Sequence, residues 1–162
     1  MRLTKRRFLL SSLAACATGV TGMTRSFAET IEKLVLSKAE WKARLTPQQY
    51  EVLRRAGTEP AGTSPLNDEK RAGIYHCAGC DLSLFDAATK YDSGTGWPSF
   101  YDFIPGHLLT KRDFKLVVPR TEYHCARCDG HQGHVFKDGP APTGLRYCNN
   151  GVALTFVPAE DA

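Results

Sequence analysis

Two short cysteine pairs constrain the fold of this chain more than any other feature of its sequence. Cys77-Ala78-Gly79-Cys80 and Cys125-Ala126-Arg127-Cys128 share the Cys-x-x-Cys spacing and lie far apart along the chain. Each pair can place two thiolates on one side of a tight turn, and four thiolates satisfy the tetrahedral preference of Zn²⁺. The spacing predicts a structural zinc site with Cys77, Cys80, Cys125 and Cys128 as ligands, which ties distant segments together and leaves no position open for chemistry.

Two other interpretations of the cysteine pairs stay open, namely two disulfides or two redox-active pairs. A redox pair usually begins a helix that follows a strand. The residues after Cys80 and Cys128 lack the apolar periodicity of a helix. We therefore favour zinc over both alternatives.

The N-terminal segment has the composition of an export signal. Residues 1–28 carry basic residues and no acidic residue, an apolar stretch over residues 8–20, and the small residues Ser26 and Ala28. This pattern predicts cleavage after Ala28 and a periplasmic location, and residues 4–9 resemble a twin-arginine signal. A lipid-bearing Cys16 is the alternative. An uncleaved membrane anchor fits poorly, because the apolar stretch is shorter than about 20 residues.

Charge and composition describe residues 29–162 as one folded domain. The formal net charge of +4 comes from the basic residues of 1–28, so the rest is close to neutral and predicts no nucleic-acid partner. Hydrophobic residues make up 42% and charged residues 23%, which suits a globular domain and excludes disorder. We expect a monomer that meets a membrane only during export.

Local patterns predict an α+β fold that is mainly β. Ser37-x-x-Glu40 and Thr46-Pro47 begin two short helices, and Gly57 can end the second. Short extended runs follow, which predict two antiparallel sheets in a sandwich or open barrel with the N-terminal helices at one side. These runs cover residues 74–76, 82–85, 114–118, 123–124, 135–136, 146–148 and 152–157.

Cys148 is the cysteine that remains after the two pairs are set aside. Side chains alternate along an extended segment, so Arg146, Cys148 and Asn150 share one face. A cation two residues before a thiol lowers its pKa, which favours a reactive thiol. A buried free cysteine that packs as a small hydrophobic residue is the alternative.

Other segments offer groups that a reactive thiol could use. Trp97 lies between Gly96 and Pro98, a placement that can present the indole on a loop as readily as bury it in the core. His131 and His134 lie three residues apart, and a turn at Gly133 could direct both imidazoles to one point. Imidazole can give or take a proton near neutral pH. The two histidines could equally be surface residues or metal ligands beside Cys128.

Several longer motifs, in this order, resemble the B-type peptide-methionine sulfoxide reductases. They are residues 75–80, 93–100, 120–122, 125–128, 131–136 and 138–148, and the resemblance extends from about Leu36 to Phe156. It implies two antiparallel sheets with N-terminal helices, a structural zinc held by the two cysteine pairs, and stereospecific reduction of the R epimer of methionine sulfoxide. Oxidised proteins would be the substrate, and free methionine sulfoxide could be reduced as well.

The resemblance also implies a role for each motif residue. Cys148 would attack the sulfoxide sulfur, release methionine and become a sulfenic acid. His131 and His134 would transfer the proton and position water, and Asn150 would help to hold the substrate. Trp97 and Phe136 would form an apolar wall for the substrate methyl. Arg146 would stabilise the thiolate electrostatically.

Two positions depart from the family pattern. Many relatives carry a resolving cysteine where this chain has Thr95, so we expect an external thiol, thioredoxin-like or small, to reduce the sulfenic acid directly. Relatives commonly have Ser where this chain has Gly151.

Two other functions compete with this one. The first is a zinc-stabilised module that binds peptides without turnover. The second is a thiol-disulfide oxidoreductase that uses the cysteine pairs.

Overall fold

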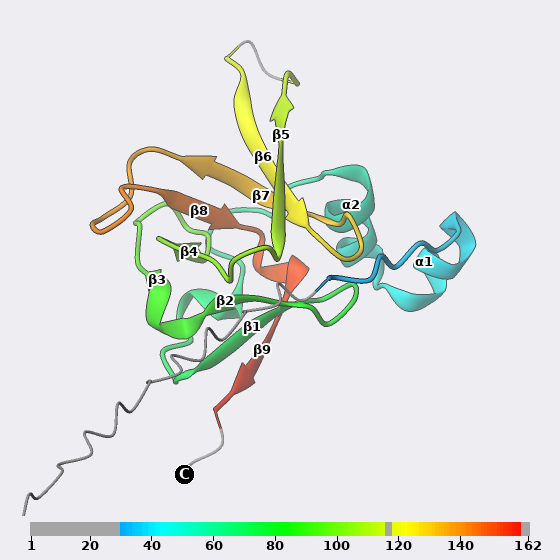
Figure 1. The fold of residues 1–162 in the computed structure, drawn as a ribbon, viewed down its shortest axis with the longest axis horizontal. Helices are drawn as coiled ribbons and strands as arrows, with labels where there is room; N and C mark the ends of the chain where they lie inside the picture. Colours follow the sequence, from blue (N-terminus) through cyan, green and yellow to red (C-terminus); the bar gives the residue numbers. More distant parts are fainter. Residues whose placement is uncertain (1–29, 116–117, 160–162) are drawn as a thin grey trace, which may run out of the picture.

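The computed structural model describes residues 30–115 and 118–159, so the predicted export signal and Cys16 lie outside the described residues. Within these ranges, two helices precede nine strands that form two antiparallel sheets (Figure 1). The prediction of an α+β fold, mainly β, is confirmed. Among the described residues, no helix has both the length and the apolar character needed to cross a membrane.

Both helices begin at the capping motifs that the sequence predicts. Helix α1 (Lys38–Arg44) and helix α2 (Pro47–Arg55) each start with a capping box, in which the cap side chain and the third helical residue bond to each other's backbone N–H. Helix α2 ends one residue earlier than expected, because Ala56 adopts the left-handed conformation (φ 50°) and acts as the C-cap in place of Gly57. In Figure 1 the helices lie at one side of the sheets.

The strands divide into a small and a large sheet. The small sheet has the order β2-β1-β9 and contains β1 (Gly73–Cys77), β2 (Ser83–Asp86) and β9 (Leu154–Pro158). The large sheet has the order β3-β4-β8-β7-β6-β5 and contains β3 (Lys90–Tyr91), β4 (Ser99–Phe100), β5 (Leu108–Asp113), β6 (Arg120–Cys125), β7 (His131–Phe136) and β8 (Arg146–Asn149). Strands β7 and β8, which carry most of the predicted catalytic residues, therefore lie side by side within the large sheet.

One strand was predicted in the wrong place. Phe114, Lys115 and Val118 lie in the connection between β5 and β6, and the side chains of Phe114 and Val118 are 71% and 72% exposed. The real strand, β5, ends at Asp113 and has four exposed residues between two buried ones. Its backbone pairing with β6 defines it, so the apolar pattern used for prediction did not mark it.

Aromatic side chains join the two sheets. Phe85 of the small sheet stacks on Phe100 of the large sheet with ring centroids 4.1 Å apart, and it also meets the edges of neighbouring rings. Tyr123 and Tyr147 extend this cluster within the large sheet, with their centroids 5.4 Å apart. Aromatic rings bury large areas and pack in fixed edge-to-face or stacked arrangements. The cluster thus supports β6 and β8 from the face opposite to the site.

Candidate active site

Cys148 lies in β8, between β4 and β7. Its cross-strand neighbours are Ser99 of β4 and His134 of β7. Tyr147 and Asn149, the residues on either side, are 6% and 0% exposed, whereas Cys148 is partly exposed. The alternation that the sequence predicts therefore holds along β8, and the Cys148 side chain faces away from the aromatic core.

A cavity of about 120 Å³ opens at Cys148 and brings together several of the predicted site residues. Its lining comprises Thr58, Trp97, Arg120, Gly133, His134, Phe136, Cys148, Asn149 and Asn150. The indole and the phenyl ring supply an apolar surface, whereas the imidazole and the amides supply polar groups. Two predicted site residues, His131 and Arg146, do not line this cavity and lie beside it.

Buried Glu59 holds two of these residues in place. Its backbone carbonyl accepts a hydrogen bond of 3.1 Å from the Trp97 indole N–H, and its backbone N–H donates to Asn150 Oδ1 at 3.0 Å. The carboxylate, on a residue 5% exposed, accepts from the backbone N–H groups of Gly151 and Val152. The loop before the sheets thus fixes both the indole wall and the segment after β8.

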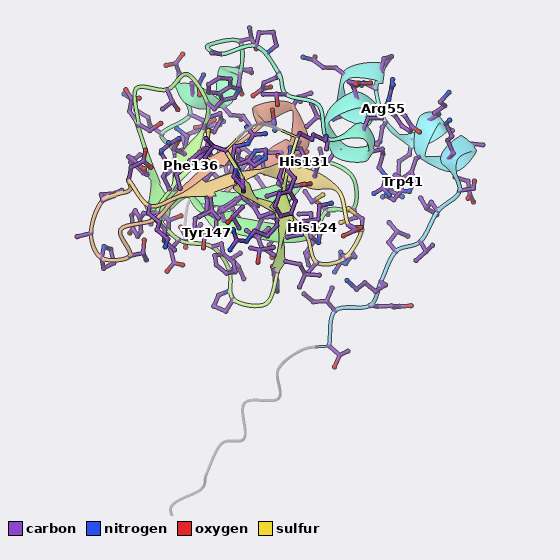
Figure 2. All side chains as sticks on the ribbon, turned by 90° about the horizontal axis from the view of Figure 1, so that it is seen from above. Trp41, Arg55, His124, His131, Phe136 and Tyr147 are labelled. Carbon is purple, nitrogen blue, oxygen red and sulfur yellow. The ribbon has the colours of Figure 1, made fainter. Side chains whose placement is uncertain are left out.

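A β-bulge in β7 places the two histidines together. Residues three apart on a regular strand point to opposite faces, but the pairing of β6 with β7 passes from Tyr123–Gly133 to His124–His131, which leaves Gln132 as an extra residue. The His131 and His134 rings consequently lie with their centroids 5.4 Å apart. Figure 2 shows His131 and Phe136 at the two ends of β7. The expectation of a turn at Gly133 is therefore wrong, and a bulged strand brings the imidazoles together instead.

Gly133 has a different function from the one expected. It lies opposite Asn149, and a Cβ at this position would overlap the carbonyl oxygen of Cys148. Glycine therefore allows β7 to approach β8 closely beside the thiol.

Each histidine is held by a buried carboxylate. His131 Nδ1 lies 2.7 Å from Glu122 Oε1, and His134 Nε2 lies 2.8 Å from Asp113 Oδ2. Asp113 also accepts a hydrogen bond of 2.7 Å from Arg120. His131 Nε2 is buried and has no hydrogen-bond partner among the described residues. Both ring orientations are therefore fixed, and His131 Nε2 is a ring nitrogen that these contacts leave unpaired.

Burial keeps the two histidines neutral over a wider pH range. It lowers the pKa of His131, against the opposing effect of the Glu122 carboxylate, and it lowers the pKa of His134, against the opposing effect of Asp113. Near neutral pH both imidazoles are therefore in the neutral form, in which each ring has one N–H group and one nitrogen that can accept a proton.

The Cys148 thiol has a higher pKa than its sequence neighbours indicate. Burial raises the pKa of Cys148, while the charge of Arg146 and the Thr95 hydroxyl lower it by less. The Arg146 guanidinium donates two hydrogen bonds, of 2.9 and 2.8 Å, to Asp138 and lies 4.3 Å from the centre of the Phe136 ring. Arg146 thus acts on the thiol in the predicted direction, but the carboxylate offsets its charge and burial outweighs it.

The two cysteine pairs form one cluster. Cys77 ends β1 and Cys80 lies in the connection to β2, whereas Cys125 ends β6 and Cys128 lies in the connection to β7. All four Sγ atoms lie within 4.8 Å of one another. Two separations between the pairs are 3.6 Å for Cys77–Cys128 and 3.4 Å for Cys80–Cys125. A tetrahedral Zn²⁺ with bonds of about 2.3 Å would need sulfur atoms about 3.8 Å apart. The cluster fits a metal ion, and all four cysteines are free thiols, which argues against the two disulfides.

Several residues of the site were not identified from the sequence. Glu122 belongs to the Arg120–Glu122 motif, but its spacing gave it no role. Asp113, Glu59 and Gln132 reach the site only through strand pairing and loop packing, so no local pattern could have identified them.

Comparisons with known proteins agree with this geometry. The SelR domain matches residues 45–158. The peptide methionine sulfoxide reductase MsrB of Pseudomonas putida (strain W619) is 53% identical over 133 residues, which covers 82% of this chain and 100% of that protein. The chloroplastic peptide methionine sulfoxide reductase B1 of Arabidopsis thaliana is 52% identical over 128 residues, 78% of this chain and 63% of that protein. On this similarity, the chain belongs to the SelR-domain family, that of the B-type methionine sulfoxide reductases.

Proposed function

We propose that this protein reduces the R epimer of methionine sulfoxide in oxidised proteins and so repairs oxidative damage. The observation that carries the proposal is the cavity in which the Cys148 thiol meets an apolar wall of Trp97 and Phe136 and the polar His134. The names of the relatives support the reaction, since they are peptide methionine sulfoxide reductases.

The cavity has the groups that each part of the sulfoxide requires. The sulfoxide sulfur is stereogenic, because it carries a methyl group, an oxygen and the rest of the side chain. With the methyl against Trp97 and Phe136 and the oxygen toward the histidines, one epimer alone presents its sulfur to Cys148. The family resemblance supports the R epimer as that one.

The chemical step transfers the sulfoxide oxygen to the cysteine. The Cys148 sulfur attacks the sulfoxide sulfur and forms a transient S–S bond, while the thiol proton passes to the oxygen. The hydroxyl then moves from the substrate sulfur to the Cys148 sulfur as the S–S bond breaks, and its electron pair returns to the substrate sulfur. The products are methionine and a Cys148 sulfenic acid. The thiol keeps its proton until substrate arrives, because burial raises its pKa. Neutral His134 and His131 can accept this proton and return it to the oxygen, a proton-relay role that their carboxylate partners stabilise.

The next step needs a reductant from outside the chain. Cys77, Cys80, Cys125 and Cys128 are buried together, and this chain has Thr95 at the position where the family resemblance implies a resolving cysteine. A first external thiol attacks the sulfenic sulfur and water leaves, which forms a mixed disulfide. A second thiol then releases Cys148. We propose a thioredoxin-like or small thiol as this reductant.

The four-cysteine cluster would hold one structural Zn²⁺, whose chemistry here is to bind thiolates and keep them from oxidation. The sulfur separations support this assignment. We further propose that the protein is exported to the periplasm through a twin-arginine-like signal and acts as a monomer. The composition of residues 1–28 supports export.

Replacement of Cys148 by Ser tests the proposed reaction. The variant should fold and keep its metal but lose sulfoxide reduction with dithiothreitol as reductant, whereas retained turnover would refute the assignment. Mass spectrometry of the wild type after one turnover should find a sulfenic acid at Cys148, and an intramolecular disulfide to this residue would refute direct reduction by an external thiol. A folded, metal-loaded wild type that binds methionine sulfoxide without reducing it would support the binding module instead.

A further inference from the structure

Gln132 is a fully buried amide that the proposed reaction does not use. It is the extra residue of the β7 bulge and is 0% exposed. Burial of an amide is costly unless its donor and acceptor groups both find partners. Its two ends should therefore identify the groups that it serves.

One end of the Gln132 side chain reaches the cysteine cluster. Nε2 donates a hydrogen bond of 3.3 Å to Cys77 Sγ. An N–H group directed at a cysteine sulfur stabilises its thiolate form, which is the form that binds a metal. The orientation of the amide follows from this contact, since the opposite orientation would place its oxygen against the thiolate.

The other end reaches the strand of the nucleophile. Gln132 Oε1 accepts a hydrogen bond of 3.4 Å from Asn149 Nδ2, and the same nitrogen donates to the Asn150 carbonyl at 2.8 Å. Asn149 Oδ1 accepts a bond of 2.8 Å from the Tyr123 hydroxyl. Asn149 and Tyr123 are both 0% exposed, so a continuous line of buried polar groups leads from Cys77 to the residue that follows Cys148.

The Gln132 backbone strengthens the same connection. Its carbonyl accepts two hydrogen bonds of 2.9 Å, one from the backbone N–H of Asn150 and one from Asn150 Nδ2. Gln132 therefore holds the end of β8 through both its backbone and its side chain. Hydrogen-bonded networks of buried polar groups rigidify the elements that they join.

We propose that Gln132 is a positioning residue that couples the metal-binding cysteines to the segment from Cys148 to Asn150. Metal retention and the arrangement of this segment then depend on each other, because the Gln132 amide makes hydrogen bonds to both. The inference rests on the assignment of the four cysteines as zinc ligands. It does not depend on which substrate the cavity accepts.

Metal retention, measured without substrate, tests this proposal. The zinc-loaded purified protein is titrated with a chromophoric zinc chelator of known affinity. Gln132→Met keeps the length of the side chain but removes both polar groups, and it should weaken zinc binding about 10- to 100-fold. Asn149→Val should also weaken it several-fold, although none of the hydrogen bonds of Asn149 goes to a cysteine.

A core variant separates this effect from a general loss of stability. Phe85→Leu loosens the aromatic cluster and removes no polar group, so it should retain zinc as the wild type does. The proposal is overturned if Gln132→Met retains zinc as well as Phe85→Leu, or if Asn149→Val binds zinc with wild-type affinity. Should Gln132→Met fail to fold, the result for Asn149→Val decides. Sulfoxide turnover is assayed separately, so failure of the proposed reaction would not be mistaken for failure of this coupling.

Discussion

A Cβ at position 151 should destabilise the protein through one identified contact. Gly151 follows Asn150 and begins the 3₁₀ turn before β9, and a Cβ there would overlap Ser64 Oγ and lie 2.6 Å from Ser64 Cβ. The new Cβ has little room to shift away from Ser64, because Oε1 of Glu59 would lie 3.3 Å from it on another side. The same carboxylate accepts a hydrogen bond from the Gly151 N–H. Overpacking of a closed site costs about 1–3 kcal/mol. We therefore expect Gly151→Ala to lower the free energy of unfolding by about that amount.

Urea unfolding measures this cost. For an m-value of about 2 kcal/mol/M, a loss of 1–3 kcal/mol lowers the midpoint by roughly 0.5–1.5 M. Ser64→Gly should remove the overlap and cost only a few tenths of a kcal/mol as a cap substitution, so Gly151→Ala should be nearly neutral in that background. Ser64→Ala keeps its Cβ and should rescue only in part. If the Ser64→Gly background leaves the cost of Gly151→Ala unchanged, the packing argument is wrong.

Two further predictions concern Cys148. Because burial raises the pKa of Cys148, the rate at which iodoacetamide alkylates this thiol should keep rising through pH 9. Arg146→Met should shift this pH profile to still higher pH. A plateau of the alkylation rate below pH 8 would show that the pKa of Cys148 is not raised. Because the Thr95 hydroxyl lowers the pKa of the Cys148 thiol through a hydrogen bond, Thr95→Cys should let a disulfide form after one turnover, seen as the loss of both thiols by mass spectrometry. A sulfenic acid that persists in this variant would show that the two side chains do not meet.

The parts of the fold that local patterns determine could be predicted from the sequence. The two capping boxes begin helices where predicted, because a cap needs only residues within one turn of each other. The Cys-x-x-Cys turns and the alternation along β8 are local in the same sense. Strand β5 was missed because its residues are mostly polar and exposed, and its pairing with β6 cannot be read from its own sequence.

The candidate site shows the same division. Cys148 and the two histidines could be identified as reactive residue types in suggestive positions, but the bulge that aligns the histidines depends on the register between β6 and β7. The direction in which the pKa of Cys148 is shifted could not be predicted either, since it depends on burial and on the pairing of Arg146 with Asp138. Burial and pairing across the chain are properties of the fold, so residue spacing alone cannot supply them.

The most direct test of the account is the turnover of the separate R and S epimers of peptide methionine sulfoxide by the purified protein, with dithiothreitol as reductant. The account predicts that the R epimer is consumed while the S epimer persists, because the apolar wall and the histidines leave one orientation for attack by Cys148. Equal consumption of both epimers would contradict the proposed arrangement, in which the apolar wall, the histidines and Cys148 each contact a different group on the sulfoxide sulfur. Consumption of neither by a folded, zinc-loaded sample would contradict the proposed reaction.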